Sequence, residues 1–103
     1  MILKCKNYSI PYTAIQWNWN FAEVYNFTDH KVNWREKLDG LLVIHLDDTR
    51  FPEGVEINLG DYIVKDFEGI IGIYSEDEFN KIFEEIEDDE FKELCKELYN
   101  MMR

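Results

Sequence analysis

The residues with the clearest chemical character in this chain are its carboxylates, which gather toward one end of the sequence. From Ser75 to Arg103 there are eleven Asp or Glu residues against four Lys or Arg, a net charge of −7, whereas the 74 preceding residues carry −4. Few of these acids have a lysine four positions away that would neutralise them. A surface of this kind repels nucleic acids and membranes and attracts basic proteins. The sequence therefore predicts a protein that binds a basic protein surface, with no direct contact to nucleic acid or membrane.

The acidic residues expected to contact such a partner follow one another closely in the sequence. They are Glu84, Glu85, Glu87, Asp88, Asp89, Glu90, Glu93 and Glu97. Their spacing loosely imitates the phosphates of a nucleic acid strand, which suggests mimicry of DNA or RNA. The simpler alternative is that they only keep the chain soluble, because exposed helix faces are often charged.

Aromatic side chains form a second group with binding potential. They could stack on nucleobases or on another planar ligand, with cationic side chains nearby to hold a phosphate. This alternative ligand cleft would be lined by Trp17, Trp19, Tyr25, Lys31, Trp34 and Arg35. With Lys37, the two cations form a small basic cluster, which favours a small nucleotide over a long nucleic acid. The competing interpretation is that the tryptophans belong to the core.

Residues that could catalyse a reaction or bind a metal are few and lack the spacing that such sites need. His45 with Asp47 and Asp48 could bind a hard cation, but the sequence has no HxH, HExxH or CxxC motif. The acidic run at 84–90 lacks the alternating ligands and the turn glycine of an EF-hand loop. No nucleophile elbow or phosphate-binding loop is present. We therefore expect a non-enzymatic protein without metal or cofactor.

Cysteine use and hydropathy predict where the protein works. Cys5 and Cys95 lie far apart in the sequence, and we expect both to be reduced thiols. No apolar run approaches the length of a membrane span, and the first residues do not resemble a signal peptide. The sequence thus favours the cytoplasm.

Most of the chain before position 75 has the pattern of short strands separated by turns. Strands are expected at Tyr12–Trp17, Val32–Trp34, Leu41–Leu46 and Glu56–Leu59, followed by a hairpin of Tyr62–Lys65 and Ile70–Tyr74. Gly69 supplies the positive φ of the hairpin loop. A short helix is expected near Asn20–Asn26, with Phe21, Val24 and Tyr25 at helical spacing.

The pattern becomes helical at Ser75, which forms a capping box with Glu78. Phe79, Ile82, Phe83 and Ile86 then share one helical face, which predicts a helix over Ser75–Glu87. A second helix is expected to begin near Asp88 or Asp89. Its apolar stripe comprises Phe91, Leu94, Cys95, Leu98, Met101 and Met102. We expect this stripe to pack within the chain, with a weak homodimer as the alternative to a monomer.

These elements predict one α+β domain over residues 1–103, with 1–74 mainly β and 75–103 an acidic helical segment. The expected core is a small, twisted, mostly antiparallel sheet of five or six short strands, curled around the helix Ser75–Glu87. One short N-terminal helix and two C-terminal helices complete the fold. Two independent cores would each be small for a chain of this length.

The stretch GDYIVKDFEGIIGIYSEDEFNKIFEEI, at Gly60–Ile86, together with YTAIQW resembles a family of small phage and prophage proteins. Members read roughly AIQW, a variable middle, then GD(W/Y)I(I/V)K, a glycine, and F, K and EEI near the end. The matching positions are Gly60, Asp61, Ile63, Lys65, Gly69, Phe79, Lys81, Glu84, Glu85 and Ile86. The family's YPCKPD is replaced by Gly72–Asp77, which adds acid, and residues 87–103 extend beyond the resemblance.

The resemblance implies a phage-related setting and a small α+β fold, and it transfers no active site. Combined with the acidic segment, it suggests an inhibitor of a host defence system, for example of a CRISPR effector nuclease. In this interpretation the acidic surface would occupy a basic groove that normally binds nucleic acid. The alternatives are a protein that sequesters a small immune-signalling nucleotide and a minor phage structural or assembly protein.

Overall fold

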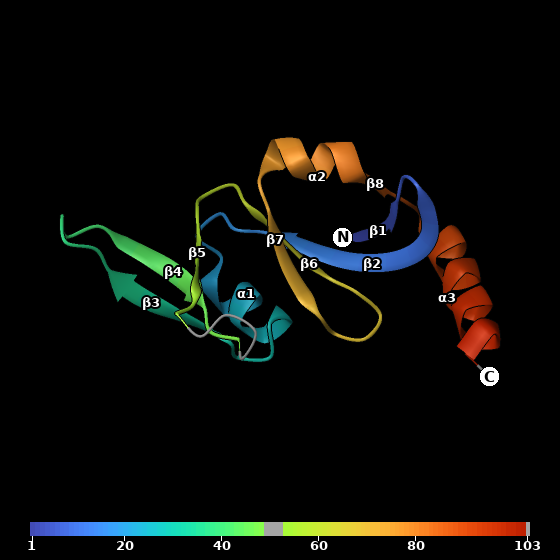
Figure 1. Ribbon diagram of the computed structural model, residues 1–103, viewed down its shortest axis with the longest axis horizontal. Coiled ribbons are helices and arrows are strands. Elements are labelled where there is room, and N and C mark those ends of the chain that lie inside the picture. Colours follow the sequence, from blue (N-terminus) through green and yellow to red (C-terminus); the bar gives the residue numbers. More distant parts are fainter. Residues whose placement is uncertain (49–52, 103) are drawn as a thin grey trace. The chain divides into compact units, whose positions relative to one another are not determined.

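The elements of the chain divide into two compact units, as described by a computed structural model of residues 1–48 and 53–102. Residues Met1–Ile15 and Tyr62–Arg103 form one unit, called here the terminal unit. Residues Gln16–Asp61 form the other, the central unit. Across the described residues the chain is α+β, with eight strands and three helices, and Figure 1 labels these elements.

The terminal unit is built on a five-stranded sheet with the strand order β7-β6-β2-β1-β8. Its strands are β1 (Ile2–Cys5), β2 (Tyr8–Gln16), β6 (Tyr62–Lys65), β7 (Ile71–Tyr74) and β8 (Phe83–Glu85). Strand β1 pairs antiparallel with both β2 and β8, and β6 pairs antiparallel with β7. The long strand β2 curves strongly, as Figure 1 shows. The hairpin of β6 and β7 confirms the sequence prediction.

Helix α2 (Glu76–Ile82) connects the two edge strands β7 and β8 and supplies the centre of the core. The predicted capping box is present at the N-terminus of this helix. The Glu78 N–H donates to the Ser75 hydroxyl, and the Glu78 carboxylate accepts from the Ser75 N–H. Phe79 is buried with four other residues, Leu3, Ala14, Val64 and Phe83. Its ring stacks on Tyr62 with 3.8 Å between centroids.

The predicted helix over Ser75–Glu87 is too long, because α2 ends at Ile82. Residues Phe83–Glu85 instead form β8, which pairs with Cys5, Lys4 and Leu3 of β1. Phe83 and Ile86 have the spacing of a helical face, but both are buried as part of an extended segment instead of a helix. Backbone pairing with β1, a strand that the sequence prediction missed, outweighs the local helical pattern.

Helix α3 (Asp88–Met102) begins where the second helix was predicted and lies against β1. Leu94 is the buried residue of this helix, while Phe91 and Leu98 are half-buried. The rest of the predicted apolar stripe is exposed: Cys95, Met101 and Met102. The stripe therefore packs within the chain along part of its width only.

The central unit contains a three-stranded antiparallel sheet and helix α1 (Phe21–Phe27). Its strands, in the order β3-β4-β5, are β3 (Val32–Glu36), β4 (Leu42–Leu46) and β5 (Val55–Ile57). The strand predicted at Leu41–Leu46 corresponds to the central strand β4, and the strand predicted at Glu56–Leu59 corresponds to the edge strand β5. The buried aliphatic residues of this unit are Val24, Val32, Ile44, Leu46 and Ile57.

The observed fold class agrees with the prediction at the level of α+β with mainly antiparallel strands, but the strand number and arrangement differ. Five or six strands in one sheet were expected, and the described residues hold eight strands in two sheets. The acidic segment at 75–103 contains β8 between its two helices. The prediction that the units form one domain stays a prediction. No helix in the described part of the chain has the length and hydropathy needed to cross a membrane.

Candidate binding surfaces

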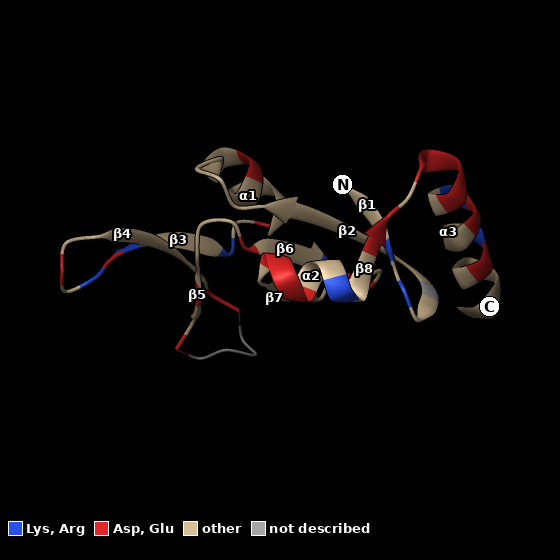
Figure 2. Ribbon diagram, turned by 90° about the horizontal axis from the view of Figure 1, so that it is seen from above, with Lys and Arg blue, Asp and Glu red and all other residues tan. Residues whose placement is uncertain are grey.

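All eight carboxylates predicted to contact a partner are exposed on the terminal unit. Glu84 and Glu85 lie on β8, and the others lie in the turn after it and on α3. In Figure 2 acidic colour marks the end of β8 and the first turn of α3, with a short tan interruption between them. We call these eight residues the acidic surface. They share the interval 84–97 with two lysines, which leaves a net charge of −6.

Lys4 of β1 connects the two parts of the acidic surface. Its Nζ lies 3.3 Å from the Glu84 Oε1 and 3.1 Å from the Glu90 Oε2. Hydrogen bonds to Glu90 and then to Glu84 raise the pKa of Lys4 above its usual value of 10.5. One cation between two carboxylates thus joins Glu84 of the strand to Glu90 of the helix, whereas Glu85 projects from the opposite face of β8. Sequence reasoning missed Lys4, because only the pairing of β1 with β8 brings it to Glu84.

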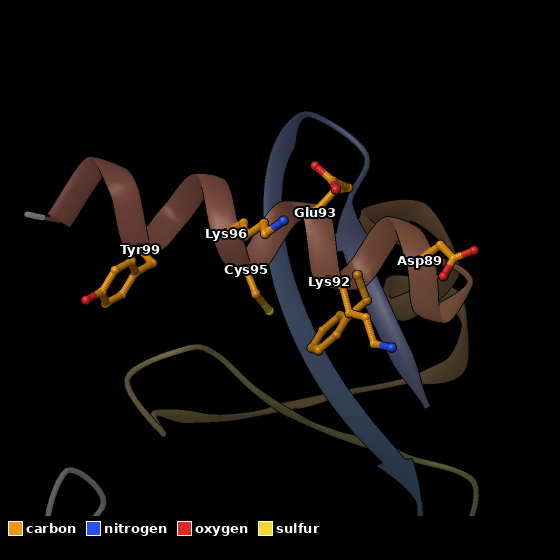
Figure 3. A pocket seen from close by; sticks show the side chains of 7 residues that line it. Asp89, Lys92, Glu93, Cys95, Lys96 and Tyr99 are labelled. Carbon is orange, nitrogen blue, oxygen red and sulfur yellow. The ribbon is translucent and has the colours of Figure 1, made fainter.

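On α3 the acidic and apolar residues lie on different sides of the helix. Glu90, Glu93 and Glu97 follow one another at spacings of three and four, which places them on one face. Phe91, Leu94 and Leu98 face the unit, as their burial shows. Figure 3 shows Glu93 pointing to one side of α3, whereas Cys95 and Tyr99 point to another. The acids are therefore free to face a partner without disturbing the packing of the helix.

A hollow of about 690 Å³ runs beside α3 on the side of Cys95 and Tyr99. A smaller hollow of about 240 Å³ shares Phe91 and Cys95 with it and reaches Tyr12 and Phe67. The larger hollow is lined by Phe91, Cys95 and Tyr99 and by four charged residues of the helix, Asp89, Lys92, Glu93 and Lys96. Of the predicted stripe, Phe91 and Cys95 line both hollows.

The aromatic residues predicted as an alternative ligand cleft meet in the central unit, but they form a stack instead of a cleft. Neighbouring rings lie nearly parallel, with interplanar angles of 22°, 21°, 23° and 10° along the series. The series, called here the aromatic stack, is Trp19, Trp34, Phe21, Tyr25 and His30. Trp17 is 3% exposed and lies tilted against the rings of Trp19 and Trp34.

Sequence reasoning identified Trp17, Trp19, Tyr25 and Trp34 as a group but missed two members of the stack. Phe21 lies four residues before Tyr25 on α1, so the two rings share a helix face. That spacing was a usable signal. His30 stacks on Tyr25 with 4.3 Å between centroids because the chain turns back after α1, where the His30 N–H donates to the Tyr25 carbonyl. The sequence carries no comparable signal for this turn.

The two cations predicted for the same cleft are engaged by carboxylates. The Arg35 guanidinium donates to the Asp47 Oδ1 at 2.8 Å, and Asn33, on the same face of β3, also donates to the Asp47 carboxylate. Residues alternate between the faces of a strand, so Arg35 and Trp34 project from opposite faces of β3. Lys31 lies 3.9 Å from the Asp48 carboxylate. The structure therefore brings the predicted rings together but separates Arg35 from them.

The residues considered for a metal site do not converge on one. Asp47 is bound by Asn33 and Arg35, and Asp48 lies beside Lys31. The His45 Nδ1 is buried without a hydrogen-bond partner in the described structure. Over residues 1–48 and 53–102 no three side chains of His, Cys, Asp or Glu are arranged to hold a metal ion. Cys5 is buried and Cys95 is exposed, and both are free thiols.

Comparison with protein-family models, with curated proteins and with solved structures finds no match to this chain.

Proposed function

We propose that this chain is a non-enzymatic binding protein whose acidic surface occupies a basic groove on a partner protein. The observation that carries the proposal is the continuity of the acidic surface across β8 and α3, with Lys4 between Glu84 and Glu90. Scattered acids would serve solubility equally well. Here Lys4 joins Glu84 of the strand to Glu90 of the helix, and the segment 84–97 that contains both carries a net charge of −6.

A surface that concentrates like charges destabilises the protein that bears it, because the carboxylates repel one another. Basic grooves that bind nucleic acid are built to meet rows of phosphates, and a row of carboxylates on a helix and a strand presents similar charge. The proposed partner is therefore a nucleic-acid-binding protein. The resemblance to phage proteins supports a more specific version, in which the chain inhibits a host defence nuclease such as a CRISPR effector in the bacterial cytoplasm.

The test is a pull-down from bacterial lysate with the whole chain and two triple variants. The first replaces Glu85, Glu93 and Glu97 by Gln, which lowers the charge of the acidic surface and leaves both Lys4 ion pairs in place. The matched control replaces three exposed acids elsewhere, Glu53, Glu68 and Glu76, by Gln and changes the net charge equally.

The expected result is a nucleic-acid-binding protein that the original chain and the control variant retain and the acidic-surface variant loses. Retention should also weaken sharply as salt rises toward about 1 M, because screening then acts within about 3 Å. Equal capture by all three proteins, or equal capture at high salt, would contradict the mimicry of nucleic acid. Co-purification with phage particles alone would instead indicate a structural or assembly role.

A further inference from the structure

The aromatic stack exposes large apolar rings to solvent, and one of them is carried by a residue with an unfavourable backbone conformation. Trp19 is 62% exposed and Trp34 is 42% exposed. Trp19 also has a φ of 74°, in the left-handed region that a bulky residue rarely adopts. Asp29 and His30, at the other end of the stack, have φ values of 55° and 67°. Because Asp and His adopt this region more readily than a bulky residue, the strain is concentrated at Trp19, and strain of this kind clusters at binding sites.

The turn that carries Trp19 is held by its neighbours. The Asn18 N–H donates to the Asn20 Oδ1 at 2.9 Å, and the Asn20 amide group donates to the Glu23 carboxylate at 3.4 Å. These bonds fix the chain on either side of Trp19, while the buried Trp17 supports the rings of Trp19 and Trp34. The indole of Trp19 is therefore presented at the end of the stack before any ligand arrives.

The geometry of the rings restricts what they can bind. Because the rings lie nearly parallel, they offer flat faces and do not surround a ligand as an aromatic cage does. A flat group can stack on such a face, and two common flat groups are a nucleobase and the guanidinium of arginine.

The charge around the stack decides between these two ligands. The central unit has nine acidic residues against four basic ones, a net charge of −5. Its described cations are each paired: Lys31 with Asp48, Arg35 with Asp47 and Lys37 with Glu56. A nucleotide phosphate would have to displace one of these carboxylates and would be repelled by the rest. A cation would be attracted.

A carboxylate suited to a guanidinium lies on the same strand as one of the exposed rings. Glu36 follows Trp34 by two residues on β3, so the two side chains project from the same face of the strand. Glu36 is exposed and has no ion-pair partner in the part of the chain that the structure describes. Arginine can place its planar face on an aromatic ring while its N–H groups donate to a carboxylate beside it.

We propose that the aromatic stack of the central unit binds the guanidinium group of an arginine side chain on a partner protein. Trp19, the end ring of the stack, supplies the flat contact, and Glu36, two residues after the neighbouring Trp34 on β3, supplies the acceptor. The inference does not depend on the acidic surface, which belongs to the terminal unit.

The test is a titration of the whole chain with N-acetyl-arginine-N-methylamide, followed by the indole N–H signals of the three tryptophans in NMR spectra. The matched probes are the lysine analogue and AMP. The main variant is Trp19→Asn, because asparagine accepts a left-handed backbone and removes the ring without adding strain. Tyr8→Ala removes an exposed aromatic residue outside the stack and serves as control. Glu36→Gln tests the acceptor.

The expected result is binding of the arginine probe that shifts the Trp19 and Trp34 signals and weakens about two- to five-fold in Trp19→Asn, as an exposed cation–π contact implies. Glu36→Gln should also weaken binding of the arginine probe. Tyr8→Ala and the acidic-surface variant should bind the probe as the original chain does. The lysine probe should bind more weakly. Equal binding of both cations, stronger binding of AMP, unchanged affinity in Trp19→Asn, or no binding of any probe would each overturn the proposal.

Discussion

Replacement of Phe79 by Ala tests both the core of the terminal unit and the cooperativity of the chain. The ring is 5% exposed, stacks on Tyr62 with 3.8 Å between centroids and lies 5.5 Å from the ring of Phe83. Phe→Ala substitutions in cores cost about 3–5 kcal/mol, and loss of the aromatic contacts places this one in the upper half of that range. With an m-value of about 1.5 kcal/mol per M, the urea midpoint should fall by about 3 M.

The assay follows urea unfolding with two signals that report on different units. All three tryptophans lie in the central unit, so their fluorescence reports on its structure. Far-UV circular dichroism reports mainly on the terminal unit, because α2 and α3 have 7 and 15 residues against 7 in α1. If the chain is one cooperative domain, both signals should shift equally in Phe79→Ala.

Phe79→Leu is the matched control, since it keeps most of the apolar volume and should cost about 1–1.5 kcal/mol. A loss below about 2 kcal/mol in Phe79→Ala would refute the assignment of Phe79 to the centre of the core. A fluorescence transition that stays in place while the dichroism transition moves would refute the single cooperative domain.

Three further predictions concern individual side chains. Ser75→Ala should lower the free energy of unfolding by about 1 kcal/mol in urea titrations, because the capping box of α2 is lost; an unchanged midpoint would contradict its contribution. The raised pKa of Lys4, due first to its hydrogen bond with Glu90, contributes stability that is fully present below pH 10.5 and is lost as the pH rises through the raised value. Melting temperatures measured across this range should fall less in Lys4→Met than in the original chain, and parallel curves would argue against the two ion pairs. In thiol titration of the native chain with a charged disulfide reagent, Cys95 should react fast and Cys5 only after unfolding; two fast thiols would show that β1 is not protected.

The sequence alone determined the features that depend on neighbouring residues. The capping box at Ser75, the hairpin of β6 and β7, the start of α3 and the helical spacing in α1 are local patterns. In each, the backbone hydrogen bonds are made between residues close in sequence, and each appears where predicted. The concentration of acid after position 75 was equally visible, because charge is a property of composition.

Tertiary structure decided the features in which local and distant interactions compete. Phe83–Glu85 continue the apolar spacing of the preceding helix, yet they form a strand that pairs with β1. The pairing gives hydrogen-bond partners to backbone groups that the last turn of a helix would leave unpaired. The same pairing brings Lys4 between Glu84 and Glu90, although it is distant from both in sequence.

The aromatic stack shows the same division within one site. The tryptophans could be recognised as a group, but strand alternation places Arg35 on the face opposite Trp34, where Asp47 neutralises it. His30 joins the stack only because the chain turns back after α1. Composition thus predicted an aromatic surface beside cations. In the folded protein, the cations predicted beside this surface are instead paired with carboxylates. The direction of a side chain depends on its register in the folded sheet and not on its identity.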